Sequence, residues 1–322
     1  MTRRMTVLSG PSSGLPASGA AVTIGNFDGV HRGHRELLRR TVEYAASAGI
    51  PSVAVTFSPH PVRHFSPSAR FYEISSHAER AALIAEAGID YLLVEPFDEK
   101  LGSMTPDAFA HDFLVGRLHT RHLVVGYDFN FGAGRAGSPS TLIGLGAALG
   151  FTVEIVPALY RGGAIVSSSR IRELLLGGRV REAEDLLCRP YRLSGPVVTG
   201  MQRGHKLGFP TANIRFTQEL APLPGVYIVD AEVEGRRCRG VANIGFNPTF
   251  GDNSLGLEVH LLEPTGDLYG KEMAVDFRER IRDERKFENI EALVRQIADD
   301  VRFAQTSSVR PPSGSRTGES GE

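Results

Sequence analysis

The chain has 322 residues, which at about 150 residues per domain indicates two domains. Its 36 Lys and Arg residues against 37 Asp and Glu residues give a net charge of −1, which excludes a protein that binds nucleic acid through bulk positive charge. No apolar run reaches the roughly 18 residues of a transmembrane helix, and two cysteines are too few for a disulfide scaffold or zinc ribbon, so we expect a cytoplasmic protein.

Strand-like and helix-like segments alternate through the first half of the chain. Strands are predicted over residues 20–25, 51–57, 89–97, 122–129 and 151–160, and amphipathic helices over 33–49, 77–88, 106–118 and 138–150. This alternation predicts an α/β domain with a doubly wound parallel sheet of Rossmann-like type, joined by right-handed crossovers. Two short helices broken at Gly177 and Gly178 are expected over residues 167–187.

The pattern changes after Arg189 and Pro190. Short alternating segments separated by Gly, Pro, Asn and Asp predict an antiparallel β-barrel or sandwich, of which we favour the barrel, closed by a helix over residues 288–304. We therefore expect one domain over residues 1–188, a second over 189–304, and a disordered tail over 305–322, which has almost no apolar residues.

The sequence GNFDGVHRGHRELL begins where the first predicted strand ends. Ligands bind at the carboxyl ends of strands in doubly wound sheets, and a helix that begins there attracts anions. His31, Arg32 and His34 lie at this helix start, where cationic side chains oppose the helix dipole, so we interpret them as facing a polyphosphate. The run is neither a Walker A loop nor a GxGxxG motif. Zinc bound by these histidines with His60 and His64 is the alternative, but no cysteine or tight carboxylate group accompanies them.

Together with TFSPHP (56–61), VVGYDFNFG (124–132) and SSSRIR (167–172), this run resembles the H-x-G-H nucleotidyltransferases. It is most similar to the N-terminal module of bacterial bifunctional riboflavin kinase/FAD synthetases. The resemblance implies that the module transfers the adenylyl group of ATP to FMN and releases pyrophosphate. No protein nucleophile is needed, because catalysis consists of positioning and charge stabilisation.

The resemblance also implies roles for individual residues. His31 and His34 would be catalytic and donate to phosphate oxygens. The nucleotide and its phosphates would be bound by Gly25, Phe27, Asp28, Gly29, Gly33, Ser167, Ser168, Arg170 and Arg172, and the flavin side by His60, Asp128 and Asn130. Simpler alternatives stay open, because serines before a helix are good caps, and His60 and Asp128 could each cap a loop. Asn130 stands where many relatives carry Arg.

A second motif, GMQRGHKLGFPTAN, opens the barrel half of the chain. Glycine at 200, 204 and 208 permits close approach of the backbone to a ligand. In an extended segment Thr211 and Asn213 point to one face, and a hydroxyl and an amide oxygen suit Mg²⁺. A polar face on an edge strand is the simpler alternative.

GFPTAN resembles the riboflavin kinase signature, and PGVYIV (224–229), GVANIGFNPTFG (240–251), DLYGKEM (267–273) and RDERKF (282–287) match that family in its order. The resemblance implies that this module phosphorylates riboflavin with ATP. Thr211 and Asn213 would bind Mg²⁺, and Gly204, Lys206, Gly208 and Pro210 the nucleotide. Relatives often have a Gly-Arg pair where this chain has Gly204 and His205.

A carboxylate base is expected to accept the proton of the attacking ribityl hydroxyl. Glu258 aligns with the family's catalytic glutamate. It alternates with Leu257 and Val259, so a solvated strand face is the alternative, and Asp252, Glu263 and Asp267 are weaker candidates for the base.

The sequence thus predicts one polypeptide that converts riboflavin to FMN and FMN to FAD. Riboflavin, FMN, FAD and ATP are its expected small-molecule partners, and neither nucleic acid nor a membrane is expected. An enzyme with one competent module is the first alternative. The second is a β-barrel that binds nucleic acid, which the net charge and the lack of tryptophan disfavour.

Overall fold

The computed structural model describes residues 4–10, 15–66, 68, 70–200, 207–246, 255–263 and 266–309. The chain divides into two compact units, Met1–Ser168 and Ser169–Glu322. The sequence predicts a domain boundary near residue 188. The structure instead groups the residues from Ser169 to 188 with the second unit. None of the described helices has both the length and the apolar character needed to cross a membrane.

The first unit is built on a parallel sheet with the strand order β1-β4-β3-β2-β5-β6. The strands are β1 (Thr6–Ser9), β2 (Ala20–Ile24), β3 (Ser52–Ser58), β4 (Tyr91–Pro96), β5 (Thr120–Gly126) and β6 (Thr152–Val156). From β2 the chain moves outward through β3 and β4, whereas β5 leads to β6 in the other direction. The order therefore reverses between β2 and β5, which is the switch point where doubly wound sheets bind ligands.

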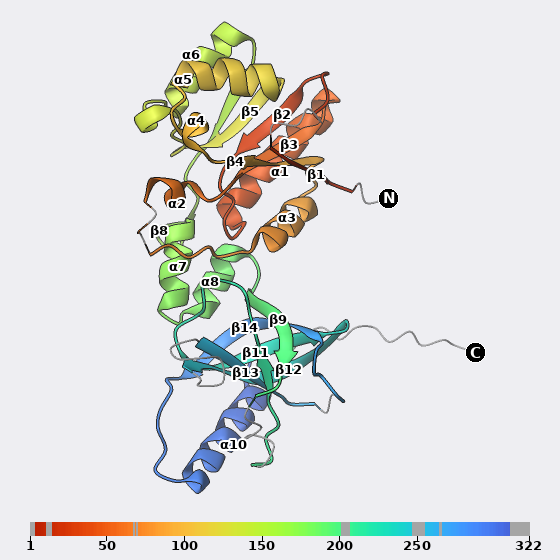
Figure 1. Cartoon of the computed structure of the whole chain (residues 1–322), viewed down its shortest axis with the longest axis vertical. Helices are drawn as coiled ribbons and strands as arrows, with labels where there is room; N and C mark the ends of the chain where they lie inside the picture. The colour runs from red at the N-terminus through yellow and green to blue at the C-terminus, as the bar shows by residue number, and fades with distance from the viewer. Residues whose placement is uncertain are drawn as a thin grey trace, which may run out of the picture. The chain divides into compact units, whose positions relative to one another are not determined.

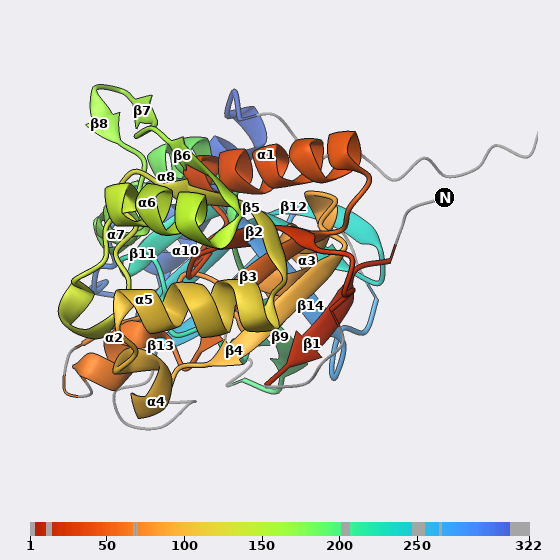
Figure 2. The same ribbon diagram turned by 90° about the horizontal axis from the view of Figure 1, so that it is seen from above.

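Helices cover both faces of this sheet (Figure 1). On one face α1 (Arg32–Ala48) and α3 (His77–Glu86) contribute Leu38 and Ile84 to a core that includes Val124. On the other face the π-helix η1 (Phe109–Arg117) and α6 (Pro139–Leu149) pack against β2 and β5. In Figure 2, α1 and the continuous helix that begins with α5 (Pro106–Ala108) flank the strands from opposite sides.

Several short elements differ from the sequence prediction. The single helix expected over residues 106–118 consists of α5 and the π-helix η1, since apolar spacing does not distinguish α from π hydrogen bonding. The edge strand β1 and the hairpin of β7 (Tyr160–Arg161) and β8 (Ala164–Ile165) were not predicted, because runs of two to four residues carry too little periodicity. The remaining short helices are α2 (Pro61–Phe65), α4 (Glu99–Gly102) and η2 (Ala133–Arg135).

The second unit begins with the predicted helix pair, α7 (Ser168–Leu176) and α8 (Val180–Leu187), broken at Gly177 and Gly178. Gly178 has φ +72°, and a Cβ there would lie 2.6 Å from Cδ of Arg280. A residue with a side chain would therefore be strained at this turn and would also displace Arg280. The helix α8 packs on β14 and β9 of the sheet described next.

Six antiparallel strands form a closed barrel of order β10-β13-β12-β11-β14-β9. They are β9 (Tyr191–Val198), β10 (Ala212–Ile214), β11 (Gly225–Val233), β12 (Arg236–Phe246), β13 (Leu255–Leu261) and β14 (Glu272–Arg282). The helix α10 (Ile290–Thr306) packs Ala304 against Val226, Ile228 and Val241 on the outside of the barrel. This confirms the antiparallel barrel with a closing helix.

Candidate active sites

The sheet order brings three loops of the first unit to one edge. Strands β3, β2 and β5 are neighbours and parallel, so their carboxyl ends lie side by side. Gly25 follows β2, His60 follows β3, and Asp128 follows β5. The first predicted site is therefore assembled at the switch point from loops that are distant in sequence.

The loop after β2 has an unusual backbone. Phe27 and Val30 have φ values of +48° and +40°, and Gly29 between them has +80°. Positive φ costs a residue with a Cβ about 1–3 kcal/mol, and it persists only where the surroundings hold it. Both Phe27 and Val30 are fully buried, so packing holds this loop in its strained form.

The side chain of Asp28 attaches this loop to the segment before α3. Its carboxylate accepts the backbone N–H groups of Ile74, at 2.9 Å, and Ser75, at 3.1 Å, and it is almost completely buried. Arg80 of α3 approaches the same carboxylate, with Nη2 3.5 Å from Oδ1. The Asp28 side chain thus fixes the position of the residues that follow it.

His31 is the N-cap of α1. Its Nδ1 accepts the backbone N–H of His34 at 3.3 Å, the role that Ser or Asp usually has. The sequence suggests cationic side chains here, but an imidazole that accepts at Nδ1 is neutral and carries its proton on Nε2. A Cβ at Gly33 would lie 3.2 Å from the His31 ring, so glycine leaves room for that ring.

His34 stacks on His31 with ring centroids 3.6 Å apart and has its edge toward Phe27. Burial lowers the pKa of His34 well below the ordinary 6.5, and the nearby His31 and Arg80 lower it further. Two uncharged imidazoles therefore stand together at the N-terminus of α1.

The segment at the start of α7 returns to this loop. Ser168 Oγ donates a hydrogen bond of 2.9 Å to the backbone carbonyl of Asp28. Ser167 directly precedes the helix. Arg170 and Arg172 lie beyond Ser168 in the second unit, where Arg170 forms an ion pair of 3.2 Å with Glu173.

The residues predicted for the flavin side follow β3 and β5. His60 is buried and caps α2, with Nδ1 accepting from Val62 N at 3.2 Å, and its ring lies against Phe71. Asp128 and Asn130 are exposed, and the Asn130 amide donates to the Asp128 carbonyl at 2.7 Å. Both histidine caps leave Nε2 as the protonated nitrogen.

In the barrel, strand register brings together the residues of the second predicted site. Glu258 on β13 lies directly opposite Asn213 on β10 and Asn243 on β12. Directly paired residues share a face, so the three side chains form one row across three strands. Leu257 and Val259 are fully buried, whereas Glu258 points to the other face and is partly exposed, as the alternation predicts.

Asn213 is buried, and its Oδ1 has no hydrogen-bond partner among the residues that the structure describes. A Cβ at Gly200 would overlap the Asn213 amide, which explains glycine at that position. His260 Nδ1 donates to the Pro210 carbonyl at 2.8 Å and holds the segment that carries Thr211 beside β13. The amide oxygen of Asn213, the residue opposite Glu258, and the hydroxyl of Thr211, two residues before Asn213 in the chain, are ligand types that suit a hard cation such as Mg²⁺.

The remaining candidates of this module fall in different places. Gly208 has φ +83°, which favours glycine. Gly204, His205, Lys206 and Asp252 lie outside the described residues. Glu263 is 4.0 Å from the Cys238 thiol, and Asp267 accepts from Tyr269 N in an exposed turn, so neither joins the row of Glu258.

Sequence reasoning did not single out Asn243 or Arg80. Asn243 is known only through its register with Glu258, and its amide donates to Glu284 at 3.2 Å. Arg80 sits inside an ordinary helical pattern, so only its burial distinguishes it. The described residues contain no group of three or more His, Cys, Asp or Glu side chains that could hold a metal ion.

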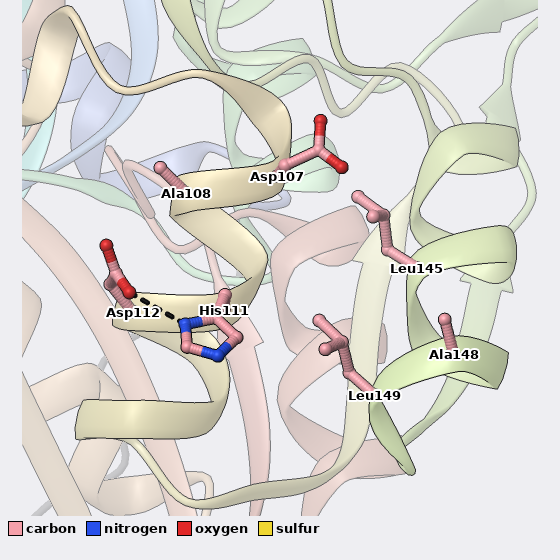
Figure 3. A pocket seen from close by; sticks show the side chains of 7 residues that line it. All are labelled: Asp107, Ala108, His111, Asp112, Leu145, Ala148 and Leu149. Atoms are coloured by element: carbon pink, nitrogen blue, oxygen red, sulfur yellow. Dashed lines mark hydrogen bonds and ion pairs between the residues drawn. The ribbon is translucent and has the colours of Figure 1, made fainter.

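A surface pocket of about 430 Å³ lies between the helices α5 and η1 and the helix α6 (Figure 3). Leu145 and Leu149 line one side, and His111 is bound to Asp112 on the other at 2.8 Å. It contains none of the predicted site residues, so the candidate active sites are defined by side-chain geometry and topology.

Comparison with known proteins gives two family matches. The family model for FAD synthetase matches residues 16–170, and the model for riboflavin kinase matches residues 187–308. A bifunctional riboflavin kinase/FMN adenylyltransferase of Pseudomonas fluorescens is 41% identical over 288 residues, covering 89% of this chain and 92% of the relative. The enzyme of that name from Escherichia coli K12 is 39% identical over 289 residues, with the same two shares.

A solved structure from Streptococcus pneumoniae, described as a macrolide-efflux protein, is also similar. It superimposes with a TM-score of 0.87 at 30% identity and covers 94% of this chain and 100% of its own. The structural similarity between the two chains therefore extends over both units of this chain.

Proposed function

The chain belongs to the family of bifunctional riboflavin kinase/FMN adenylyltransferases, and on this premise we propose which of its residues carry the two activities. It phosphorylates riboflavin to FMN with the barrel and converts FMN to FAD with the α/β unit. The observations that support the assignment are the two neutral histidines at the switch point and the row of Asn213, Glu258 and Asn243.

For adenylyl transfer, an FMN phosphate oxygen attacks the α-phosphorus of ATP, and pyrophosphate leaves. We assign His31 and His34 to the charge that develops on the phosphate oxygens. His31 Nδ1 is occupied by the N–H of His34, so Nε2–H is the donor that it offers. The strained loop of Gly25, Phe27, Asp28, Gly29 and Gly33 lets the backbone approach the nucleotide.

The other residues of this site are assigned by their loops. Ser167 and Ser168 join the nucleotide side, supported by the hydrogen bond of Ser168 to the loop backbone. His60, Asp128 and Asn130 belong to the flavin side, since they follow the strands on either side of β2. The phosphate roles of Arg170 and Arg172 stay predictions from the family resemblance.

For the kinase step, the ribityl hydroxyl attacks the γ-phosphorus of ATP, its proton passes to the Glu258 carboxylate, and ADP leaves. We propose that Thr211 and Asn213 hold Mg²⁺, because the buried Asn213 Oδ1 has no partner among the described residues and Asn213 lies in the same row as Glu258. Bound Mg²⁺ would neutralise charge on the phosphates. Gly204, Lys206, Gly208 and Pro210 would border the nucleotide.

We also propose that the enzyme works in the cytoplasm, where ATP is available. Both cysteines are unpaired, Cys188 exposed and Cys238 buried, which suits a reducing compartment. Its partners are then the small molecules riboflavin, FMN, FAD and ATP. The separation into modules near residue 188 stays a prediction, tested below.

One incubation tests the assignment. The full-length chain, given riboflavin, ATP and Mg²⁺, should form FMN and then FAD, which chromatography separates. Glu258→Gln should nearly abolish FMN formation through kcat rather than KM, because the amide keeps the size of the side chain but cannot accept a proton. Given FMN directly, the same variant should make FAD at the wild-type rate.

Glu272→Gln is the matched control and should keep both activities, since Glu272 is an exposed glutamate of the same barrel on β14, a strand that does not pair with β13. If Glu258→Gln phosphorylates riboflavin normally, Glu258 is only a strand-face residue, and Asp252, Glu263 and Asp267 become the candidates. A wild-type chain that forms only one product would favour a single competent module.

A further inference from the structure

Arg80, in the first turn of α3, is almost completely buried, with only 1% of its side chain exposed. Arginine is rarely buried to this extent unless it is paired. A cation in the first turn also opposes the helix dipole. Neither the usual burial preference of arginine nor the helix dipole therefore explains arginine at this position.

The guanidinium is paired on one side only. Nη2 alone forms an ion pair with Glu73, donates to the Ser75 carbonyl at 3.3 Å and lies 3.5 Å from Asp28 Oδ1. Nε and Nη1 are buried and have no partner among the described residues. Leaving such donors unpaired costs free energy, so the position is held for a reason other than stability alone.

The contacts of Arg80 converge on the loop of the adenylyl-transfer site. Asp28 binds the backbone of Ile74 and Ser75, and Ser75 Oγ in turn accepts the N–H of Gly29 at 3.0 Å. Arg80 contacts both Asp28 and Ser75, so it completes the hydrogen-bond network that holds the loop preceding His31 and His34.

We propose that Arg80 is a positioning residue of the adenylyl-transfer site, whose guanidinium fixes Asp28 and, through it, the strained loop that presents His31 and His34. The inference rests on the proposed role of the two histidines. A site that stabilises charge on phosphates requires its donors to be held in place before the substrate arrives.

The charge of Arg80 supports the same role. Among the described residues, the titratable groups that act on His34 are His31, stacked on it from the helix start, and Arg80 from α3, whose charge is partly balanced by Glu73 and Asp28. Arg80 and His31 both lower the pKa of His34, after burial. His34 therefore stays neutral near pH 7, and loss of Arg80 should move its titration up toward 6.5.

Arg80→Met, which keeps the length of the side chain and removes its charge and donors, tests the proposal in the full-length chain. FAD formation from FMN and ATP should fall about tenfold or more in kcat, because small misplacements of catalytic groups are costly. As the pH is lowered, the FAD rate of the variant should also begin to fall at a higher pH than the wild-type rate, since one of the groups that lower the pKa of His34 is removed. FMN formation from riboflavin should be unchanged, and Arg80→Lys should restore part of the FAD rate.

Arg39→Met is the matched control, since Arg39 lies on the exposed side of α1 and, among the described residues, forms its ion pairs with Glu36 and Glu43 of its own helix. An Arg80→Met variant with the kcat and pH profile of this control would overturn the proposal. If Arg80→Met unfolds the first unit, an NMR titration of His34 in the wild type decides. A midpoint well below 6.5 that rises in Arg80→Gln, which removes the charge, supports the role, and a midpoint that lies at 6.5 or above, or that does not change in Arg80→Gln, contradicts it. A wild type that makes no FAD at all would instead contradict the proposed function.

Discussion

In the proposed mechanism, His31 combines a structural and a chemical role in one side chain. Its Nδ1 caps α1, and this hydrogen bond fixes the tautomer that leaves Nε2–H as a donor. The capping bond thus prepares the imidazole for phosphate, and Gly33 provides the space that the ring needs. Histidine can both cap the helix and offer a donor to phosphate, whereas Ser or Asp at this position would use its side-chain oxygen for the cap.

The two roles of His31 can be separated with a pair of variants. Asn is a good N-cap, so His31→Asn should keep the stability of the first unit, whereas His31→Ala should lose about 1 kcal/mol. Both should lower FAD formation by about 10²–10³-fold, because both lose the Nε2–H donor. Thermal denaturation measures the first effect and FAD assays the second. An Asn variant with the wild-type FAD rate would show that His31 acts only as a cap.

Gly200 offers a test of the proposed Mg²⁺ ligand. A Cβ at this position would overlap the Asn213 amide, so Gly200→Ala should displace the buried Oδ1. We expect FMN formation to require a higher Mg²⁺ concentration, with partial rescue at excess Mg²⁺ and unchanged FAD formation from FMN. The control is Gly266→Ala, where a Cβ would meet open space. An unchanged Mg²⁺ dependence in Gly200→Ala would contradict Asn213 as a ligand.

At the residue scale, the sequence predicts those site residues that lie in compact motifs. Glu258, Asn213 and the two histidines are found because GLEV, GFPTAN and HRGH are local patterns within a resemblance. Asn243 and Arg80 could not be found in this way, because their positions depend on strand register and on burial between distant segments. Asp28 is predicted with the GNFDGVHRGH run, but its hydrogen bonds to the backbone of Ile74 and Ser75 are not, because these partners are 46 and 47 residues away.

At the scale of elements, the alternation of strands and helices predicts the parallel sheet well, and the motif that follows the first predicted strand lies at the switch point of the observed sheet. The sequence leaves barrel and sandwich open, because closure depends on one non-local pairing. The three residues of β10 bridge β13 and β9 and complete the barrel. A strand of three residues is too short to show the alternation of polar and apolar residues that predicts a strand, although this one carries Asn213.

The helix α10 is attached to the barrel by a buried ion pair. Arg282 of β14 donates through Nε and Nη2 to Asp300, at 3.0 and 2.7 Å, and Asp300 is buried. Asp300→Asn should destabilise the second unit by up to about 3–5 kcal/mol, since it leaves a partly buried cation without its carboxylate. Denaturant unfolding of the full-length chain, followed by loss of FMN formation, measures this change.

The neighbouring residue on the same helix provides the control for that experiment. Asp299 forms an ion pair with Arg302 in which both side chains are exposed. Exposed pairs contribute about 0–1 kcal/mol, so Asp299→Asn should have little effect. Equal effects of the two substitutions would mean that the Arg282 pair does not hold α10.

At the scale of the whole molecule, the residues proposed as catalytic for the two activities, the histidine pair and Glu258, lie in separate units. The α/β unit holds its site at the carboxyl edge of a parallel sheet, and the barrel holds Glu258 within its own strands. The row of Glu258 needs no residue of the first unit, so the kinase activity should survive separation. The position at which the chain can be divided without loss of stability depends on the helices α7 and α8, which precede the barrel.

Two fragments test the position of the boundary. The sequence predicts a domain start at Arg189, whereas the compact second unit starts at Ser169. In the structure Arg278 of β14 pairs with Glu184 of α8 at 2.8 Å, and Arg280 packs on Gly178 in the turn between α7 and α8. The apolar residues Val180, Ala183, Leu186 and Leu187 of α8 are buried, and α8 packs on β14 and β9.

A fragment of residues 189–322 loses these contacts and exposes the barrel surface beneath α8, whereas a fragment of 169–322 keeps them. Both should convert riboflavin to FMN and make no FAD, but the longer fragment should melt at a higher temperature, because burial of a single aliphatic side chain contributes about 1.5–3 kcal/mol. Equal melting temperatures would show that α8 contributes nothing to the barrel and would favour the boundary near residue 188. If the longer fragment folds but is inactive, while the full-length chain phosphorylates riboflavin, the kinase site depends on the first unit.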